Sequence, residues 1–140
     1  MKNEEIIYSN KELFKKRRLE VEKNFLVNFN ERIDDLFSSS GRIELLGNHT
    51  DHNNGLVLVS AVSLDILAGV KKVEGNYIKI ISDGYPMMHI NINNLSVSQN
   101  EIGKSSAIVK GVLQGFKDRG YKVGAFTCYA TSNIYKGAGI

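Results

Sequence analysis

Polar side chains are concentrated in one short stretch, residues 41–55, which reads GRIELLGNHTDHNNG. The stretch combines carboxylate, imidazole, guanidinium and amide groups, and glycines punctuate it at Gly41, Gly47 and Gly55. A sugar hydroxyl both donates and accepts hydrogen bonds, so it is best met by an acceptor such as Asp beside a donor such as His or Asn. Glycines let the backbone bend and approach a ligand closely. The stretch therefore favours a loop that binds a polyol, with Arg42 as a contact for an anion or for charge that develops in a transition state.

Two other interpretations of this stretch stay open from the residues alone. His49, Asp51 and His52 are possible metal ligands, although this spacing by itself is weak evidence for a metal site. Alternatively, the side chains of Asp51, Asn53 and Asn54 cap backbone groups of a turn and bind nothing.

A second Gly-rich stretch, residues 136–140, follows a predicted strand. A Gly-rich turn after a strand usually leads into a helix whose N-terminal amides face an anion. No such helix follows within the 140 residues. We therefore interpret the stretch either as a frayed terminus or as the point where a longer sequence has been truncated.

The pattern of apolar residues predicts the elements that position these stretches. Ser9 and Glu12 form a capping-box pattern, which marks the start of a helix. Apolar residues then recur at close to the helical period as far as Leu36 or Phe37. This predicts a first helix that ends at the Ser-rich break of residues 38–41.

Beyond this break, β-branched residues predict a series of short strands. We expect strands at residues 56–59, 64–70, 77–82, 89–92 and 123–130. Gly75 and Asn76 predict a hairpin turn between the second and third of these strands, and an amphipathic helix is expected from Ser105 to Gly120. The order of helix, meandering strands, helix and strand predicts an α+β fold with a mostly antiparallel or mixed sheet.

Composition excludes several classes of protein. The hydrophobic fraction of 42% is sufficient for a packed core, and a net charge of +3 is too small to indicate a nucleic-acid partner. The single cysteine, Cys128, cannot form an internal disulfide, which favours a reducing, cytoplasmic setting. No apolar run approaches the length of about 20 residues that crosses a bilayer. We therefore expect a cytoplasmic domain that binds neither nucleic acid nor membrane.

Residues 41–62, GRIELLGNHTDHNNGLVLVSAV, resemble the signature of galactokinases, which belong with the homoserine, mevalonate and phosphomevalonate kinases to the GHMP kinases. The family pattern is close to Gly-Arg-x-x-x-x-Gly-Glu-His-Thr-Asp-Tyr-Asn-x-Gly followed by an apolar strand. Residues 109–112, VKGV, are similar to a family helix of the form Tyr-Val-Lys-Gly-Val. Residues 137–140, GAGI, resemble the opening of the family's phosphate loop. The resemblance spans residues 37–140 and stops where that loop would continue.

The resemblance implies a fold, a reaction and roles for particular residues. The fold is that of the N-terminal domain of these kinases, which is also found in ribosomal proteins, and the reaction uses ATP and Mg²⁺ to phosphorylate the anomeric hydroxyl of galactose or a related hexose. Arg42 would stabilise the transition state, Asn48, His49 and Asp51 would bind the sugar, and Gly137 and Gly139 would begin the phosphate loop. No protein metal site is implied. Residues 1–140 would form a partial N-terminal domain with its sugar-binding region at about residues 37–62, and the family's catalytic Asp, the rest of the loop and the C-terminal domain would lie beyond Ile140.

Departures from the family pattern add further expectations. Asn48 stands where galactokinases have Glu, and an amide differs from a carboxylate in charge and in donor pattern, so a related hexose is an alternative to galactose. Without the general base and most of the phosphate cradle, we expect the 140 residues to be inactive. Apolar surface that the missing parts would cover favours self-association. A non-catalytic, sugar-sensing protein of the same fold is the alternative function.

Overall fold

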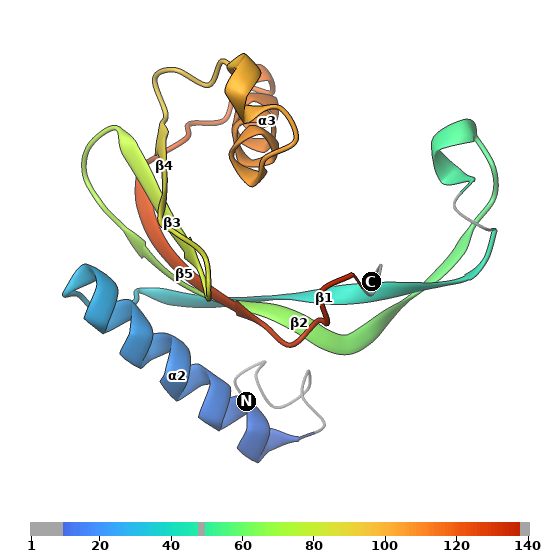
Figure 1. The fold of residues 1–140 in the computed structure, drawn as a ribbon, viewed down its shortest axis with the longest axis horizontal. Coiled ribbons are helices and arrows are strands. Elements are labelled where there is room, and N and C mark those ends of the chain that lie inside the picture. Colours follow the sequence, from blue (N-terminus) through green and yellow to red (C-terminus); the bar gives the residue numbers. More distant parts are fainter. Residues whose placement is uncertain (1–9, 48–49, 138–140) are drawn as a thin grey trace.

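A five-stranded mixed sheet organises the part of the chain that the computed structural model describes, residues 10–47 and 50–137 (Figure 1). The strands lie across the sheet in the order β1-β2-β5-β3-β4, so each strand is hydrogen-bonded to its neighbours in this order. All pairs are antiparallel except β3 and β5, which are parallel. The predicted α+β class with a mixed sheet is therefore confirmed. The strands are β1 (Asp35–Leu46), β2 (Leu58–Lys72), β3 (Tyr77–Ser82), β4 (Met88–Asn91) and β5 (Phe126–Ser132).

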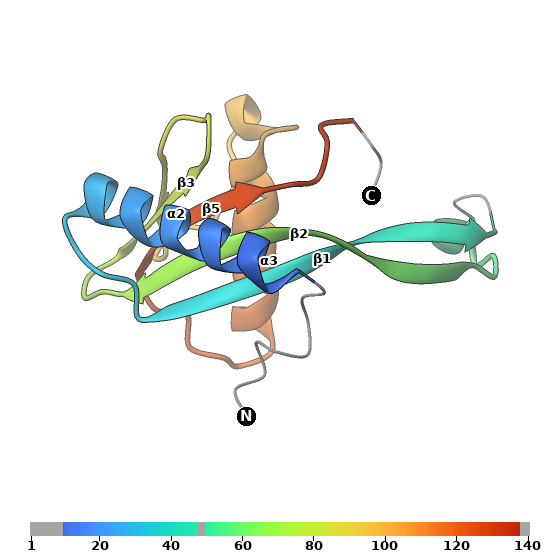
Figure 2. The ribbon, with the colours of Figure 1, turned by 90° about the horizontal axis from the view of Figure 1, so that it is seen from below.

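Two α-helices cover opposite faces of this sheet (Figures 1 and 2). Helix α2 (Lys11–Phe29) buries Phe14, Val21 and Phe25 against one face, where they meet Leu67 and Tyr129. Helix α3 (Ser105–Asp118) packs on the other face, where Leu113 joins a second apolar cluster with Ile78, Ile90, Ile92 and Leu95. The fold therefore has two cores, one on each side of the sheet.

The ends of α2 differ from the sequence prediction. The N-cap is Asn10, whose Oδ1 accepts a hydrogen bond from the backbone N–H of Leu13 at 3.0 Å, and Ser9 lies outside the described residues. The helix ends at Phe29 because Asn30 adopts a left-handed conformation with φ of 54° and donates its N–H to the Leu26 carbonyl. The prediction that the helix continues to Leu36 or Phe37 is wrong: these residues and the Ser-rich break belong to strand β1.

The connectivity of the strands also corrects the prediction. Residues 56–59 and 64–70 do not form two separate strands, because a single strand, β2, runs from Leu58 to Lys72. No hairpin joins β2 to β3, since β5 lies between them in the sheet. The chain forms its long hairpin earlier, between β1 and β2, and the β1 side of this hairpin had been expected to be helix and loop.

The outer half of the β1–β2 hairpin projects from the rest of the described chain (Figures 1 and 2). Its ladder shifts register between Ser40 and Arg42 and again between Glu44 and Leu46. A loop with one turn of 3₁₀ helix, η1 (Asp51–Asn53), closes its tip. This hairpin therefore carries most of the polar stretch that the sequence identifies.

A second 3₁₀ turn, η2 (Gln99–Glu101), precedes α3 and is held to it by Lys110. The Nζ of Lys110 lies 2.8 Å from the carboxylate of Glu101 and donates to the carbonyl of Ser96 at 3.0 Å. The bond from Lys110, followed by bonds from the backbone and hydroxyl of Ser98, lowers the pKa of Glu101 to about 2. In the described structure, the lysine of the VKGV motif thus ties a loop to its helix.

Candidate functional site

The structure places some of the predicted site residues and leaves others outside the described residues. Arg42 lies on β1, is exposed, and pairs with Ala61 of β2. Asp51 opens η1, and Gly137 lies in a turn after β5 with a φ of +80°. Asn48, His49 and Gly139 fall outside the described residues. The roles assigned to all these residues stay predictions.

The loop at the tip of the hairpin is closed by Thr50. Its Oγ1 donates a hydrogen bond to the carbonyl of Gly47 at 2.7 Å. Its own carbonyl accepts from the backbone N–H groups of Asn53 at 3.0 Å and Gly55 at 2.8 Å. This role of Thr50 was not predicted from the sequence, although Thr hydroxyls are known to bond to nearby backbone groups in turns.

Two glycines allow the loop to close this tightly. Gly47 has a φ of +116°, and a Cβ at this position would lie 2.6 Å from the carbonyl oxygen of Leu56. A Cβ at Gly55 would lie 2.1 Å from Oγ1 of Thr50. A side chain at either position would therefore force its neighbours to move, which favours glycine at both.

The second Gly-rich stretch begins beside the first. After β5, the backbone N–H of Asn133 donates to the carbonyl of Asp65 at 3.2 Å, and the backbone N–H of Asp65 donates to Oδ1 of Asn133 at 2.7 Å. Next to it, Cδ1 of Ile134 lies 3.2 Å from the point that a Cβ of Gly41 would occupy. The segment that leads to Gly137 therefore approaches β1 one residue before Arg42, although about ninety residues separate Gly41 from Ile134 in the sequence.

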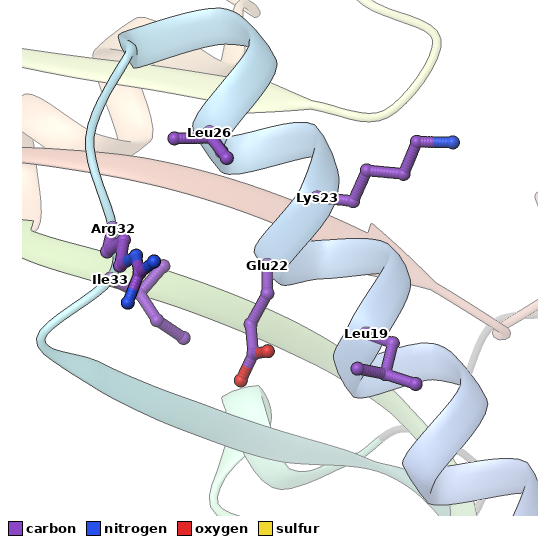
Figure 3. A pocket seen from close by; sticks show the side chains of 6 residues that line it. All are labelled: Leu19, Glu22, Lys23, Leu26, Arg32 and Ile33. Atoms are coloured by element: carbon purple, nitrogen blue, oxygen red, sulfur yellow. The ribbon is translucent and has the colours of Figure 1, made fainter.

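Two hollows lie elsewhere on the surface of the described residues. One of about 520 Å³ lies between α2 and the chain that enters β1, and Figure 3 shows Leu26, Ile33 and Glu22 around it. Another of about 450 Å³ lies at the N-terminus of α3 and is lined by Ser82, Tyr85 and Lys104, among others.

Buried titratable groups near the sheet are not candidate nucleophiles. Burial raises the pKa of the Cys128 thiol to about 11, so this side chain behaves as a small core residue. Burial and a hydrogen bond to Asp83 at 2.7 Å raise the pKa of Tyr129 to about 12. Among the described residues, no group of three or more His, Cys, Asp or Glu side chains is arranged to hold a metal ion. None of the described helices is both long and apolar enough to cross a membrane.

Comparison with known proteins shows which proteins this chain is similar to. The galactokinase galactose-binding signature matches residues 23–72. The chain is 31% identical over 121 residues to the galactokinase of Clostridium tetani, covering 86% of this chain and 31% of that protein. It is 35% identical over 108 residues to the galactokinase of Fusobacterium nucleatum, covering 74% of this chain and 27% of that protein. The chain thus spans about a third of the length of the curated relatives it matches.

Solved structures show the same fold. The structure of Lactococcus lactis galactokinase complexed with galactose superposes with a TM-score of 0.73 at 22% identity, over 85% of this chain and 31% of that one. Mevalonate kinase of Methanococcus jannaschii superposes with a TM-score of 0.58 at 14% identity, over 75% of this chain and 34% of that one. The fold is that of the N-terminal domain of GHMP kinases. Within this class, the chain is similar to galactokinases, through their galactose-binding signature at residues 23–72 and through the two curated relatives above.

Proposed function

We propose that this chain supplies the sugar-binding part of a galactokinase-like kinase. The observation that carries the proposal is the contact between the segment leading to Gly137 and the β1 strand that carries Arg42. In a kinase, a sugar-binding loop and a phosphate-binding loop must meet, because the phosphoryl donor and the acceptor hydroxyl react only when they are held together. The reaction of the whole enzyme is the transfer of the γ-phosphate of ATP to the anomeric hydroxyl of galactose or a related hexose.

Each predicted residue has a distinct role in this proposal. Asn48, His49 and Asp51 orient the sugar through its hydroxyls, and Arg42 stabilises charge that develops on the transferred group. Gly137, whose positive φ opens a turn, begins the backbone cradle for the phosphates together with Gly139. Mg²⁺ would neutralise charge on the ATP phosphates when both are bound. We place the protein in the cytoplasm, where its unpaired Cys128 stays reduced.

Calorimetry on the purified chain tests the sugar site. We expect galactose to release heat on binding to the unaltered chain, and Asp51→Ala to weaken binding at least about tenfold, since it removes an acceptor for a sugar hydroxyl. Glu74→Ala, which removes an exposed carboxylate elsewhere, should leave the heat unchanged. Heat that is unaffected by Asp51→Ala would contradict the site.

The same preparation separates a kinase part from a sugar sensor. Without a general base and a complete phosphate cradle, we expect no galactose-dependent ATP hydrolysis or transfer by the 140 residues in a coupled assay. The presence of Asn48 where galactokinases have Glu keeps the non-catalytic sensor as the second candidate function. Turnover by the purified chain would refute the proposed division of roles.

Self-association is the second part of the proposal, and one face of the projecting hairpin supports it. Leu46 pairs with Leu58 and Ile43 with Ser60 across the ladder, so Leu46, Leu58 and Ile43 share a face. These three side chains are 67%, 52% and 44% exposed. A contiguous apolar face of this kind promotes association between copies.

Light scattering tests this association. We expect the unaltered chain to have at least the mass of a dimer, and Leu46→Glu to shift it toward the monomer because a charge on this face opposes its burial. Leu19→Glu is the matched control, since Leu19 is equally exposed at 65% but lies on α2. A monodisperse monomer for the unaltered chain would contradict the proposal.

A further inference from the structure

The segment after β5 is fastened to the sheet at two neighbouring points. Asn133 exchanges two hydrogen bonds with the backbone of Asp65, one through its side-chain Oδ1 at 2.7 Å and one through its own N–H at 3.2 Å. The next residue, Ile134, packs against Gly41 of β1. We call these two contacts the Asn133 clamp. The clamp precedes Gly137 by only three to four residues.

The point to which the clamp is attached is itself held by two other elements. Asp65 is 3% exposed. Its carboxylate forms a buried ion pair with Arg17 of α2 and accepts a hydrogen bond from Oγ of Ser38 on β1 at 2.7 Å. Helix α2 and strand β1 therefore both hold the side chain of Asp65 in place, and the clamp ties the segment after β5 to the backbone of the same residue.

The clamp also lies where the β1–β2 ladder is irregular. Ser40 is paired with Asp65, but the next paired residue, Arg42, lies opposite Ala61. Across this step β1 advances by two residues while β2 advances by four. Because the ladder is interrupted between Ser40 and Arg42, regular strand pairing does not carry the position of the core through to Arg42. Contacts made at this interruption must therefore hold Arg42 in place relative to the core.

We propose that Asn133 is a positioning residue that fixes the start of the Gly-rich turn relative to Arg42. Its side chain is committed to the backbone of Asp65, so it acts through this contact and not on a substrate. The inference rests on the proposed function in assigning Arg42 and Gly137 to one reaction. The placement itself is tested without sugar or nucleotide, so its failure and a failure of the proposed function are distinguishable.

A distance measurement between two spin labels tests the clamp. The labels are placed on Ser60→Cys in the hairpin and Lys136→Cys in the turn, both exposed, in a chain whose buried Cys128 is replaced by Ala. We expect a narrow distribution in this parent and, on adding Asn133→Ala, a width at least about twice as large, because the segment after β5 then opens locally.

Asn24→Ala is the matched control, because it also removes one partly buried amide, whose Nδ2 donates to the hydroxyl of Tyr129 at 3.2 Å, but leaves the clamp intact. Broadening in Asn133→Ala alone, at temperatures well below unfolding of both variants, supports the inference. An unchanged width in Asn133→Ala, or equal broadening in both variants, overturns it.

Amide hydrogen exchange on the unaltered chain decides the matter if Asn133→Ala does not fold. The backbone N–H of Asp65 donates to the Asn133 side chain. Protection of this amide comparable to that of Leu67 in the core supports a clamp that stays closed. Exchange at the rate of an unprotected amide overturns the inference.

Discussion

Replacing Arg17 with Met should lower the free energy of unfolding by about 3–5 kcal/mol, because it leaves the carboxylate of Asp65 buried without its countercharge. The two side chains are only 11% and 5% exposed. The hydrogen bond from Ser38 reaches the other carboxylate oxygen but supplies no positive charge. Chemical denaturation followed by circular dichroism measures the change.

Arg18→Met is the matched control for this prediction. Arg18 is the next residue of the same helix and pairs with Glu22 at 2.9 Å, but its side chain is 41% exposed. Exposed ion pairs contribute about 0–1 kcal/mol, so this variant should unfold close to the unaltered chain. If both variants lose the same free energy of unfolding, the buried ion pair stabilises the fold no more than the exposed one does. A smaller loss in the double variant Arg17→Met with Asp65→Leu than in Arg17→Met would trace the cost to the unpaired charge.

The sequence predicted both described α-helices and most of the strands, but not strand β1 or how the strands connect. The 3.6-residue pattern correctly locates α2, yet one residue ends it: Asn30 takes a left-handed conformation, which a periodicity of apolar residues does not register. Leu36 is apolar because it packs against the same core as α2, but it does so from strand β1. Its position at the helical spacing is therefore a coincidence. The hairpin expected at Gly75 fails for a different reason. Its two strands are adjacent in sequence, but β5 takes the place between them, and such non-local pairing leaves no local signal.

The candidate site was predictable as a stretch but not as a structure. Residue types and glycine spacing identify residues 41–55, and the comparisons support that choice. The residues that shape the site were missed because their roles depend on contacts made by folding. Thr50 acts by closing its own loop, and Asp65, which the sequence marks only as a charge inside an apolar run, joins α2, β1 and the segment after β5.

Replacing Gly47 with Ala should abolish sugar binding while leaving the core folded. A Cβ at this position would lie 2.6 Å from the Leu56 carbonyl oxygen and 2.7 Å from Cα of Val57, so the backbone of the loop must move. That movement also disturbs the carbonyl that accepts the Thr50 hydroxyl at 2.7 Å. We expect galactose affinity to fall at least about tenfold by calorimetry. The unfolding temperature should fall only by the amount that an Ala with a positive φ causes. The loop lies at the tip of the hairpin and outside both cores, so its movement leaves the packing of the cores unchanged.

Gly75→Ala separates crowding from backbone strain in this prediction. Gly75 has nearly the same φ, +112°, but no heavy atom lies within 4 Å of the point that its Cβ would occupy. Both variants therefore incur a similar conformational cost of about 1–3 kcal/mol, and only Gly47→Ala adds a collision with backbone. If the hairpin loop is the sugar site, Gly75→Ala retains the heat of galactose binding and Gly47→Ala loses it. If both retain it, the shape of this loop does not determine binding, and the sugar must be held elsewhere on the chain.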